Sequence, residues 1–358
     1  MRRIQENQDS RTKLIYEMRS HIYGNWRTCV TYVFAELKIA DYLLESPKDV
    51  AQLGNLTETN AKVLTRFLRC AEGLGFALRD PLTEKYSLTQ LGELLSSNHP
   101  SSQRNAARLN GAAYRYGPWG NLLDVLKDGN CRNVSPTYSR GSLDYLADKP
   151  ECLEVFQLAM TELSVEENEA IAKSYNFNRF KHVADIGCGH GSFIKKVLEL
   201  NKSITGTMFD LEATLNSMHP DAANEKTGFF GRLRKKSGDF FKEVPTDCDL
   251  YLLKNVIHNW PEKKAEQLLR TIYKGMTACG NNLAIGVKRL LIIENIIPEG
   301  SENDLVKWLD LNFAVLVDGE ERTLEDYETL LKREGFSLSG IAETPVGRHI
   351  LEFKIAAQ

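Results

Sequence analysis

The sequence lacks an excess of positive charge, paired cysteines and a long apolar run. Its formal net charge is -3, so it has no basic footprint for binding nucleic acid. Its seven cysteines form no C-x-x-C pair and no zinc spacing, which is typical of a protein in a reducing cytosol. It has no apolar run near the roughly 18 residues of a membrane span, and no signal peptide. We therefore predict a soluble, cytoplasmic protein without a metal site.

The chain changes character near residue 175. Before this point apolar residues recur at helical spacing, whereas after it short apolar strands alternate with helices. Single cores rarely exceed roughly 250–300 residues, so a chain of 358 residues should divide into domains. We predict a mainly helical domain over residues 1–100, a helical linker over 101–174 and an α/β domain over 175–358. The last should be a doubly wound, Rossmann-like fold.

The pattern of residues 57–88 predicts a winged helix. A helix capped by Thr57 or Thr59 is followed by a glycine stop and a short β-ribbon. The basic residues of this helix are Lys62, Arg66 and Arg69. A winged helix can enter a DNA groove. Three basic residues do not form a basic patch, however, so a DNA-binding regulator is the minor alternative. A helical domain for dimerisation, which also covers a substrate, is favoured.

Three glycines lie between an apolar strand and a helix in "VADIGCGHGSF", residues 183–193. Glycine at such a turn lets a ligand approach main-chain N–H groups at a helix N-terminus, so a nucleotide-like cofactor is predicted. The spacing G-x-G-x-G lacks the third glycine of the dinucleotide pattern and the lysine of a P-loop, which disfavours NAD and ATP. A structural turn without a ligand is the alternative.

Polar residues also follow the later strands. Asp210 ends the strand "SITGTMFD" about twenty residues past the glycines, where a carboxylate can accept both hydroxyls of a ribose. Asp239 lies in the turn "GDFF", His258 follows the strand of "LYLLKNVIHNW" at the start of a helix, and Glu294 ends a further strand. Ligands of open α/β sheets bind outside the carboxyl ends of the strands, so these residues should gather there.

Six motifs in this order, "VADIGCGHG", "FD", "GDFF", "LLKNVIHNW", "IIEN" and "GEERT", resemble the S-adenosylmethionine-dependent O-methyltransferases of the caffeate, hydroxyindole and bacterial polyketide/phenazine type. The resemblance covers nearly the whole chain. It implies a methyltransferase domain at residues 175–358 and an N-terminal winged-helix domain that joins two chains in a homodimer. It also implies metal-independent methyl transfer to a hydroxyl of a small, natural-product-like, often aromatic substrate. Decarboxylation, hydroxylation or pericyclic chemistry with the same cofactor is the main alternative.

The resemblance also implies which residues hold the cofactor, S-adenosyl-L-methionine. The glycine turn would offer N–H groups to its carboxylate, Asp210 would accept from its ribose and Asp239 from its adenine amine, with Phe240 beside the ring. Lys254 would lie near the adenine or orient the loop. An ordinary turn at Asp239 and a snorkelling Lys254 are the alternatives. The predicted cofactor-binding residues are Asp185, Gly187, Gly189, Gly191, Asp210, Leu211, Gly238, Asp239, Phe240 and Lys254.

The resemblance matches His258 to the catalytic base, with Glu294 and Glu321 of "GEERT" as the acids that flank and orient it. A phenol has a pKa of about 10 and an imidazole of about 6.5, so the base would take the proton during transfer and not before it. A structural histidine is the alternative. The family usually has aspartate where this chain has Asn259, so one charge near the base is missing.

Aromatic and methionine side chains make adaptable apolar walls, so several are candidates for an acceptor pocket, and all are equally candidates for core packing. The predicted substrate-binding residues are Tyr116, Trp119, Phe156, Met160, Asn259 and Phe313.

Overall fold

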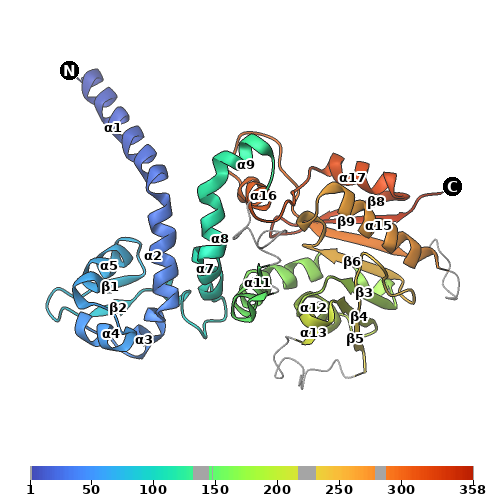
Figure 1. Cartoon of the computed structure of the whole chain (residues 1–358), viewed down its shortest axis with the longest axis horizontal. Helices are drawn as coiled ribbons and strands as arrows, with labels where there is room; N and C mark the ends of the chain where they lie inside the picture. The colour runs from blue at the N-terminus through green and yellow to red at the C-terminus, as the bar shows by residue number, and fades with distance from the viewer. Residues whose placement is uncertain (1, 132–144, 147, 217–230, 279–287, 358) are drawn as a thin grey trace. The chain divides into compact units, whose positions relative to one another are not determined.

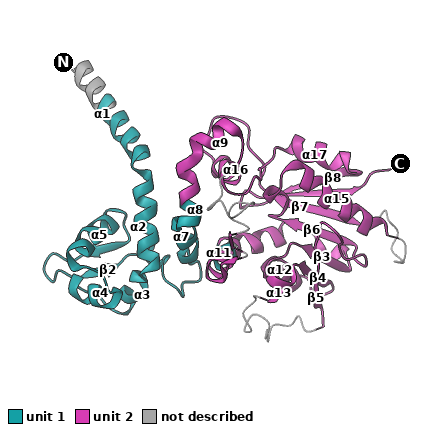
Figure 2. Cartoon of the chain, viewed as in Figure 1, with its two compact units in different colours: residues 1–116, 158–162 teal, residues 117–157, 163–358 magenta. Residues whose placement is uncertain are grey.

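The computed structural model describes residues 2–131, 145–146, 148–216, 231–278 and 288–357. The chain forms two compact units (Figure 2). Unit 1 comprises residues 1–116 with 158–162, and unit 2 comprises residues 117–157 with 163–358. In the described part of the chain, no helix combines the length and the apolar character needed to cross a membrane.

Unit 1 is mainly helical, with one small antiparallel ribbon. Its elements are α1 (Arg2–Ile22), α2 (Gly24–Glu36), α3 (Ile39–Glu45), α4 (Val50–Thr57), α5 (Ala61–Gly73), β1 (Ala77–Arg79), β2 (Tyr86–Leu88), α6 (Gln90–Glu93), α7 (Arg104–Gly111) and α8 (Ala113–Tyr116). Phe34, Leu53, Leu68 and Tyr86 form part of a core that holds α2 to α5 and the ribbon together. The helices followed by a ribbon are the winged-helix arrangement that the sequence predicts.

The predicted cap of α5 is wrong. Asn60, and not Thr57 or Thr59, precedes the helix, and its side-chain oxygen accepts the N–H groups of Lys62 and Val63. Thr57 instead ends α4, where its hydroxyl donates to Leu53 O within its own helix. The Thr59 hydroxyl lies 2.8 Å from that of Thr57, so both threonines are engaged at the end of α4 and Asn60 caps α5.

Unit 2 is built on a seven-stranded sheet in the order β5-β4-β3-β6-β7-β9-β8. Its strands are β3 (His182–Ile186), β4 (Thr205–Asp210), β5 (Leu233–Ser237), β6 (Leu250–Lys254), β7 (Arg289–Glu294), β8 (Phe336–Glu343) and β9 (His349–Ile355). The strand β9 runs antiparallel to both of its neighbours, β7 and β8, and the pairs among β5, β4, β3, β6 and β7 are parallel. The first strand of the parallel part, β3, is central, so the chain winds outward from it in both directions, as a doubly wound fold does.

Helices cover both faces of this sheet (Figure 1). The helices of unit 2 are η1 (Gly117–Asn121), α9 (Leu122–Asp128), α11 (Pro150–Lys173, of which residues 158–162 belong to unit 1), η2 (Phe177–Arg179), α12 (Ser192–Leu200), α13 (Glu212–Asn216), η3 (Ile257–Asn259), α15 (Glu262–Thr277), α16 (Leu305–Leu316) and α17 (Leu324–Arg333). Alternate strand residues point to opposite faces, so Tyr251 and Leu253 of β6 pack with α15 and α17, while Leu250 and Leu252 pack with α12. Burial on both faces explains why the strands read as continuous apolar runs.

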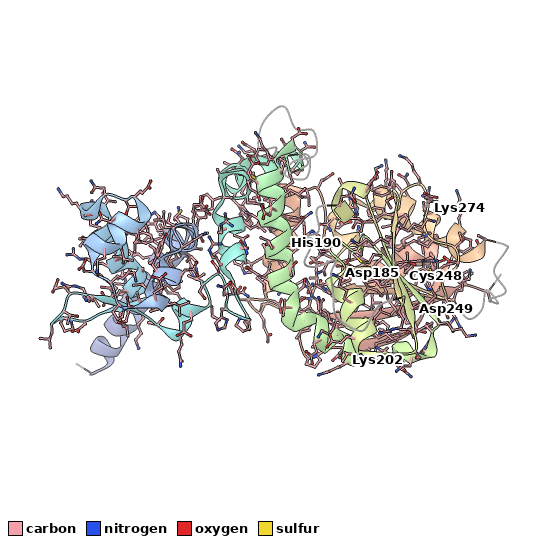
Figure 3. The ribbon with its side chains drawn as sticks, turned by 90° about the horizontal axis from the view of Figure 1, so that it is seen from below. Asp185, His190, Lys202, Cys248, Asp249 and Lys274 are labelled. Carbon is pink, nitrogen blue, oxygen red and sulfur yellow. The ribbon has the colours of Figure 1, made fainter. Side chains whose placement is uncertain are left out.

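The carboxyl ends of the parallel strands form one edge, and Asp185 and His190 mark it in Figure 3. Asp249, which precedes β6, marks the opposite edge. One detail differs from the prediction, because His258 lies in the one-turn helix η3 and the long helix α15 starts only at Glu262.

Candidate functional site

The glycine turn after β3 requires glycine for its conformation and its packing. Gly187, Gly189 and Gly191 have φ of 71°, 55° and 71°, a region that L side chains rarely adopt. A Cβ on Gly191 would also lie 2.4 Å from the Met208 side chain, and one on Gly187 would lie 3.0 Å from Val256. Nothing lies within 4 Å of the corresponding position at Gly189. The turn is therefore closely packed at both ends and open in its middle.

The N–H groups of these glycines already have partners in the protein. Gly187 donates to Phe209 O at 2.8 Å, Gly191 to Cys188 O at 2.9 Å and Gly189 to the Asp210 carboxylate at 2.8 Å. A cofactor's carboxylate would have to compete with these bonds for the glycine N–H groups, so its binding there stays a prediction. The turn also offers a surface without side chains.

Asp210 ends β4 beside this turn. Its two oxygens accept the N–H groups of Gly189 and Leu211 at 2.8 and 2.7 Å, which fixes the carboxylate. Burial raises the pKa of Asp210, and these two hydrogen bonds oppose the rise. Each carboxylate oxygen has two lone pairs, so acceptor capacity for a ribose diol remains. Leu211 is 55% exposed and presents an apolar surface next to it.

Asp239 and Phe240 follow β5. Asp239 accepts the N–H of Phe241 at 2.9 Å and pairs with Lys242 at 3.1 Å, so it makes an ordinary turn, as the alternative interpretation proposed. Its function as an acceptor for adenine stays a prediction. The Phe240 ring would lie 3.5 Å from a Cβ on Gly187, which places the ring against the glycine turn. Gly238 is needed for packing, since a Cβ there would lie 2.5 Å from the Phe209 ring.

Lys254 lies on the other face of the sheet from Phe240. Its Nζ is 5.9 Å from the Phe193 ring centroid, and Phe193 packs in the core cluster under α12, whereas Phe240 packs against the cluster under α15. Its expected place near the adenine, or its function in orienting the loop, stays a prediction. Asp185 shares the α12 face by alternation along β3, and burial raises its pKa to about 7 while Lys254 opposes the rise.

His258 lies between two buried acids at the same edge of the sheet. Its Nδ1 is 3.1 Å from Glu294 Oε2 and 3.3 Å from Glu321 Oε1. The other oxygen of Glu294 accepts the N–H groups of Val256 and Ile257 at 2.9 and 3.0 Å, which ties the end of β7 to η3. The structure thus brings together the three predicted catalytic residues.

The segment that carries Glu321 fits tightly against η3. Glu320 N donates to His258 O at 2.9 Å, and a Cβ on Gly319 would lie 2.2 Å from that same oxygen. The side chain of Asp310 accepts the Glu321 N–H at 2.9 Å. The glycine of "GEERT" therefore allows the close approach that brings Glu321 to the imidazole.

Sequence reasoning missed Asn295, which supports Glu321, and Arg322, which holds the backbone around η3. Asn295 Nδ2 donates to Glu321 Oε1 at 2.9 Å, and Arg322 donates to Ile257 O and Trp260 O. Asn295 and Arg322 are part of the motifs "IIEN" and "GEERT", but spacing along the chain does not show that these motifs meet in the fold.

The two acids determine the basicity of His258. Burial lowers its pKa, but the charges of Glu294 and Glu321 outweigh burial, and the net shift is upward. Burial also raises the pKa of Glu294, against the pull of the imidazole. Since Nδ1 faces the carboxylates, Nε2 is the ring nitrogen left to accept a proton.

Of the predicted substrate residues, Phe313 lies closest to this chemistry. Its ring centroid is 4.4 Å from that of His258. Trp119 Nε1 donates at 3.1 Å to Asn312, the neighbour of Phe313 on α16. Asn259 Nδ2 donates to Asn255 O at 3.0 Å, so its amide nitrogen supports the backbone.

The remaining three predicted substrate residues lie on α8 and α11. Phe156 is a half-buried residue of α11 in unit 2, whereas Tyr116 and Met160 belong to unit 1. Met160 is 36% exposed. Their contribution to an acceptor pocket stays a prediction.

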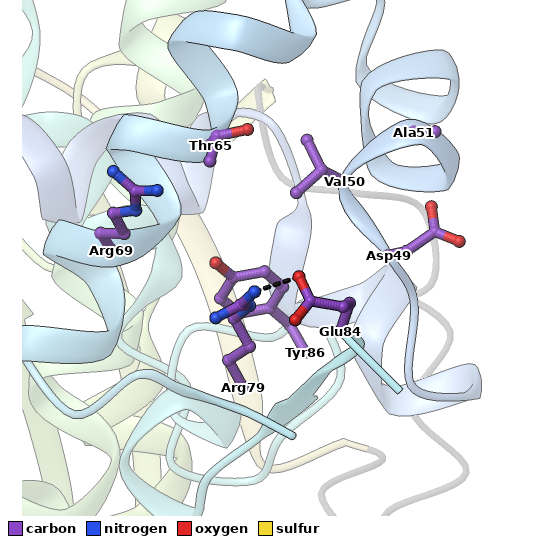
Figure 4. Close-up of a pocket in the computed structure, with 8 residues that line it drawn as sticks. All are labelled: Asp49, Val50, Ala51, Thr65, Arg69, Arg79, Glu84 and Tyr86. Carbon is purple, nitrogen blue, oxygen red and sulfur yellow. Dashed lines mark hydrogen bonds and ion pairs between the residues drawn. The ribbon is translucent and has the colours of Figure 1, made fainter. Parts of the chain in front are cut away.

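Unit 1 carries a surface hollow of about 380 Å³ in the winged helix (Figure 4). It is lined by Asp49, Val50, Ala51, Thr65, Arg69, Arg79, Glu84 and Tyr86. Arg79 is paired with Glu84, which cancels its charge. The hollow therefore adds little to the few basic residues of α5 and does not strengthen the DNA-binding alternative.

Known proteins share this fold and these motifs. A family model described as an O-methyltransferase domain matches residues 119–337. Phenazine O-methyltransferase PhzM of Lysobacter antibioticus is 32% identical over 92% of this chain and 93% of its own length. The 8-amino-8-demethylriboflavin N,N-dimethyltransferase of Streptomyces davaonensis is 34% identical over 87% of each chain. The crystal structure of LaPhzM superposes with a TM-score of 0.88, at 30% identity, over 96% of this chain and 99% of that one. The chain therefore belongs to the S-adenosylmethionine-dependent O-methyltransferases, the family that its motifs resemble.

Proposed function

We propose that this methyltransferase acts on a hydroxyl of a small aromatic acceptor, with His258 as general base. The observation that carries the proposal is the buried contact of His258 Nδ1 with Glu294 and Glu321. That contact fixes the ring, raises its pKa and leaves Nε2 as the proton acceptor. The Phe313 ring beside the imidazole supplies an apolar wall suited to an aromatic acceptor.

When bound, S-adenosylmethionine supplies an electrophilic methyl group on its sulfonium. The acceptor's hydroxyl oxygen would bond to this carbon as the carbon–sulfur bond breaks, and His258 Nε2 would take the hydroxyl proton. The imidazolium that results keeps its Nδ1–H toward Glu294 and Glu321, whose negative charge stabilises it. The products are the methyl ether, S-adenosylhomocysteine and a proton that His258 releases to water.

The residues at the carboxyl edge suit this cofactor. Asp210 would accept from the ribose hydroxyls, Leu211 and Phe240 would cover apolar faces of the nucleoside, and the glycine turn would admit it without a side chain in the way. Two facts support this assignment: the open middle of the turn at Gly189, and the fixed carboxylate of Asp210 beside it.

Relatives indicate the acceptor's class. The phenazine O-methyltransferase is named for an aromatic acceptor, and the riboflavin relative is named for methyl transfer to an amino group. A protonatable base at His258 favours a hydroxyl, because a phenol must lose its proton to become a good nucleophile whereas a neutral aromatic amine already has a lone pair.

The proposal is tested with methyl-labelled cofactor and matched phenol and aniline probes, followed by mass spectrometry. We expect label on the phenols, and His258→Gln should reduce that transfer about a hundredfold or more. The affinity for S-adenosylhomocysteine and the melting temperature should stay near those of the wild type. Label on anilines alone, or an unlabelled hydroxylated or decarboxylated product, would contradict a hydroxyl acceptor.

We propose further that two chains pair through α1 and α2 in the cytoplasm. These helices, and Tyr23 between them, carry large apolar side chains that are 44–65% exposed: Leu14, Ile15, Tyr16, Met18, Ile22, Tyr23 and Trp26. So many exposed apolar side chains within one short segment support an interaction site there. The cysteines in the described part of the chain are all free, which supports a reducing compartment.

A further inference from the structure

Arg348 is held in a fixed position at the turn between β8 and β9. Its backbone N–H donates to Thr344 Oγ1 at 3.1 Å, and its carbonyl accepts the Thr344 hydroxyl at 2.8 Å. Its Nε and Nη2 donate to the two carboxylate oxygens of Glu167 on α11, at 3.2 and 3.4 Å. Glu167 thus takes one edge of the guanidinium group.

Among the described residues, no acceptor reaches Nη1 on the other edge of this guanidinium. The side chain of Arg348 is 12% exposed, and its Nη1 is buried without a hydrogen-bond partner among the residues that the structure describes. A guanidinium has five N–H donors in a rigid plane, so Nη1 and the second N–H of Nη2 form an edge that matches a second carboxylate. Leaving a buried donor unpaired destabilises a protein, which points to a ligand that pairs with it.

This free edge lies close to the methyl-transfer chemistry. His349 on β9 pairs with Glu294, the last residue of its antiparallel neighbour β7. Arg348 therefore lies just beyond the carboxyl end of β7. Its positive charge acts on the catalytic residues, because it opposes the rise in the pKa of both His258 and Glu294. Arg348 therefore belongs to the same edge of the sheet as the proposed base.

A second cation lies near it. Lys254 interacts electrostatically with Glu167 and Arg348, yet in the described ranges no carboxylate comes within ion-pair distance of its Nζ. The glycine N–H groups that were expected to bind the cofactor's carboxylate are engaged elsewhere. Lys254 thus has no ion pair among the described residues, and Arg348, which pairs with Glu167, still has Nη1 free. Both cations can therefore take a further anion.

We propose that Arg348 Nη1 binds a ligand carboxylate in the methyl-transfer site, together with Lys254, and that Glu167 is the positioning residue that aims the guanidinium. The proposal rests on the function proposed above. A carboxylate reaches this site from either of two sources, the amino-acid end of the cofactor or a carboxylate substituent on the acceptor. Both present the same planar pair of oxygens to the free edge of Arg348.

The two sources are separated by binding experiments that need no turnover. Calorimetry compares S-adenosylhomocysteine with methylthioadenosine, which lacks the amino-acid end, and fluorescence titration compares 1-hydroxy-2-naphthoate with 1-naphthol. If the carboxylate is the cofactor's, Arg348→Gln should lower the affinity for S-adenosylhomocysteine about 10- to 100-fold and leave the affinity for methylthioadenosine unchanged. If the carboxylate is the acceptor's, only the affinity for the naphthoate should fall. Because turnover is not measured, a failure of the catalytic proposal does not affect this result.

Two further variants test the arrangement. Glu167→Gln keeps the positive charge of Arg348 but loosens its position, so it should weaken the same carboxylate ligand to a smaller extent. Arg179→Gln removes a cation that pairs with Glu352 elsewhere in unit 2 and is the matched control. The proposal is overturned if Arg348→Gln folds and binds all four probes with wild-type affinity. It is also overturned if the variant binds probes with and without a carboxylate equally more weakly and its melting temperature falls. Arg348→Lys, which keeps the charge, supplies the comparison if the glutamine variant does not fold.

Discussion

The chemistry of single residues at this site follows from burial beside opposite charge. His258 is only 7% exposed, which alone would favour the neutral imidazole, but the two adjacent carboxylates favour the imidazolium more strongly. A base that is too acidic takes no proton, and one that is already protonated cannot accept another. The balance between burial and the two acids therefore determines the pH at which the enzyme works.

The pH–rate profile tests this balance. The base acts when neutral, so activity should fall as the pH drops through the pKa of His258, and the raised pKa places this fall above the value near 6.5 of a free imidazole. Glu321→Gln removes one of the stabilising charges and should move the fall to lower pH. The measurement is single-turnover rate against pH at saturating cofactor. A profile that is the same in both proteins would show that Glu321 does not act on the base.

Asp210 gives a second prediction, on cofactor binding. Asp210→Ala removes the carboxylate that would accept the ribose hydroxyls, and hydrogen bonds to a charged group of this kind are worth about 10- to 100-fold in affinity. Calorimetry with S-adenosylhomocysteine, without added metal, should show that loss. Asp239→Ala is the informative comparison, because Asp239 is already used in a local turn. Unchanged affinity in Asp210→Ala would contradict the assignment.

At the scale of helices and strands, the sequence predicted what burial determines. The strands β3, β4, β6 and β7 were placed correctly because each is a run of apolar residues that must be covered on both faces. The cap of α5 was misplaced because a threonine hydroxyl can serve the helix behind it as well as the one ahead. The pairing of the glycine N–H groups with Phe209 and Asp210 was missed for a related reason. Spacing along the chain reveals which groups are present, but not which partner reaches them first.

The fit of the "GEERT" segment against η3 gives a prediction at this scale. Gly319→Ala would place a Cβ 2.2 Å from His258 O, so the segment must move and carry Glu321 away from the imidazole. Overpacking of this kind costs about 1–3 kcal/mol of stability. We expect the methyl-transfer rate to fall at least about tenfold while S-adenosylhomocysteine still binds, since Asp210 is untouched. Gly73→Ala, where nothing lies within 4 Å of the added carbon, is the control. Wild-type turnover in Gly319→Ala would mean that the close approach is not needed.

At the scale of the whole molecule, nothing in the described part of a single chain covers the large apolar side chains of α1 and α2. Leu14 and Ile22 are each 62% exposed, and Trp26 is 60% exposed. Burying a leucine or isoleucine side chain is worth about 1.5–3 kcal/mol, so several such residues together can hold two chains in a dimer. A surface that is exposed in the monomer can be changed without harming the fold of each unit, which makes this prediction easy to test.

The double variant Leu14→Glu with Ile22→Glu should therefore separate the chains. Light scattering at micromolar concentration should give twice the chain mass of 40.5 kDa for the wild type and the single mass for the variant. Circular dichroism and melting of the variant should show that both units stay folded. Leu82→Glu changes a side chain that is 91% exposed near the winged-helix ribbon and should leave the dimer intact, because that residue lies outside α1 and α2. A wild-type protein that is monomeric at this concentration would refute pairing through these helices, whereas a dimeric variant would place the interface on another surface.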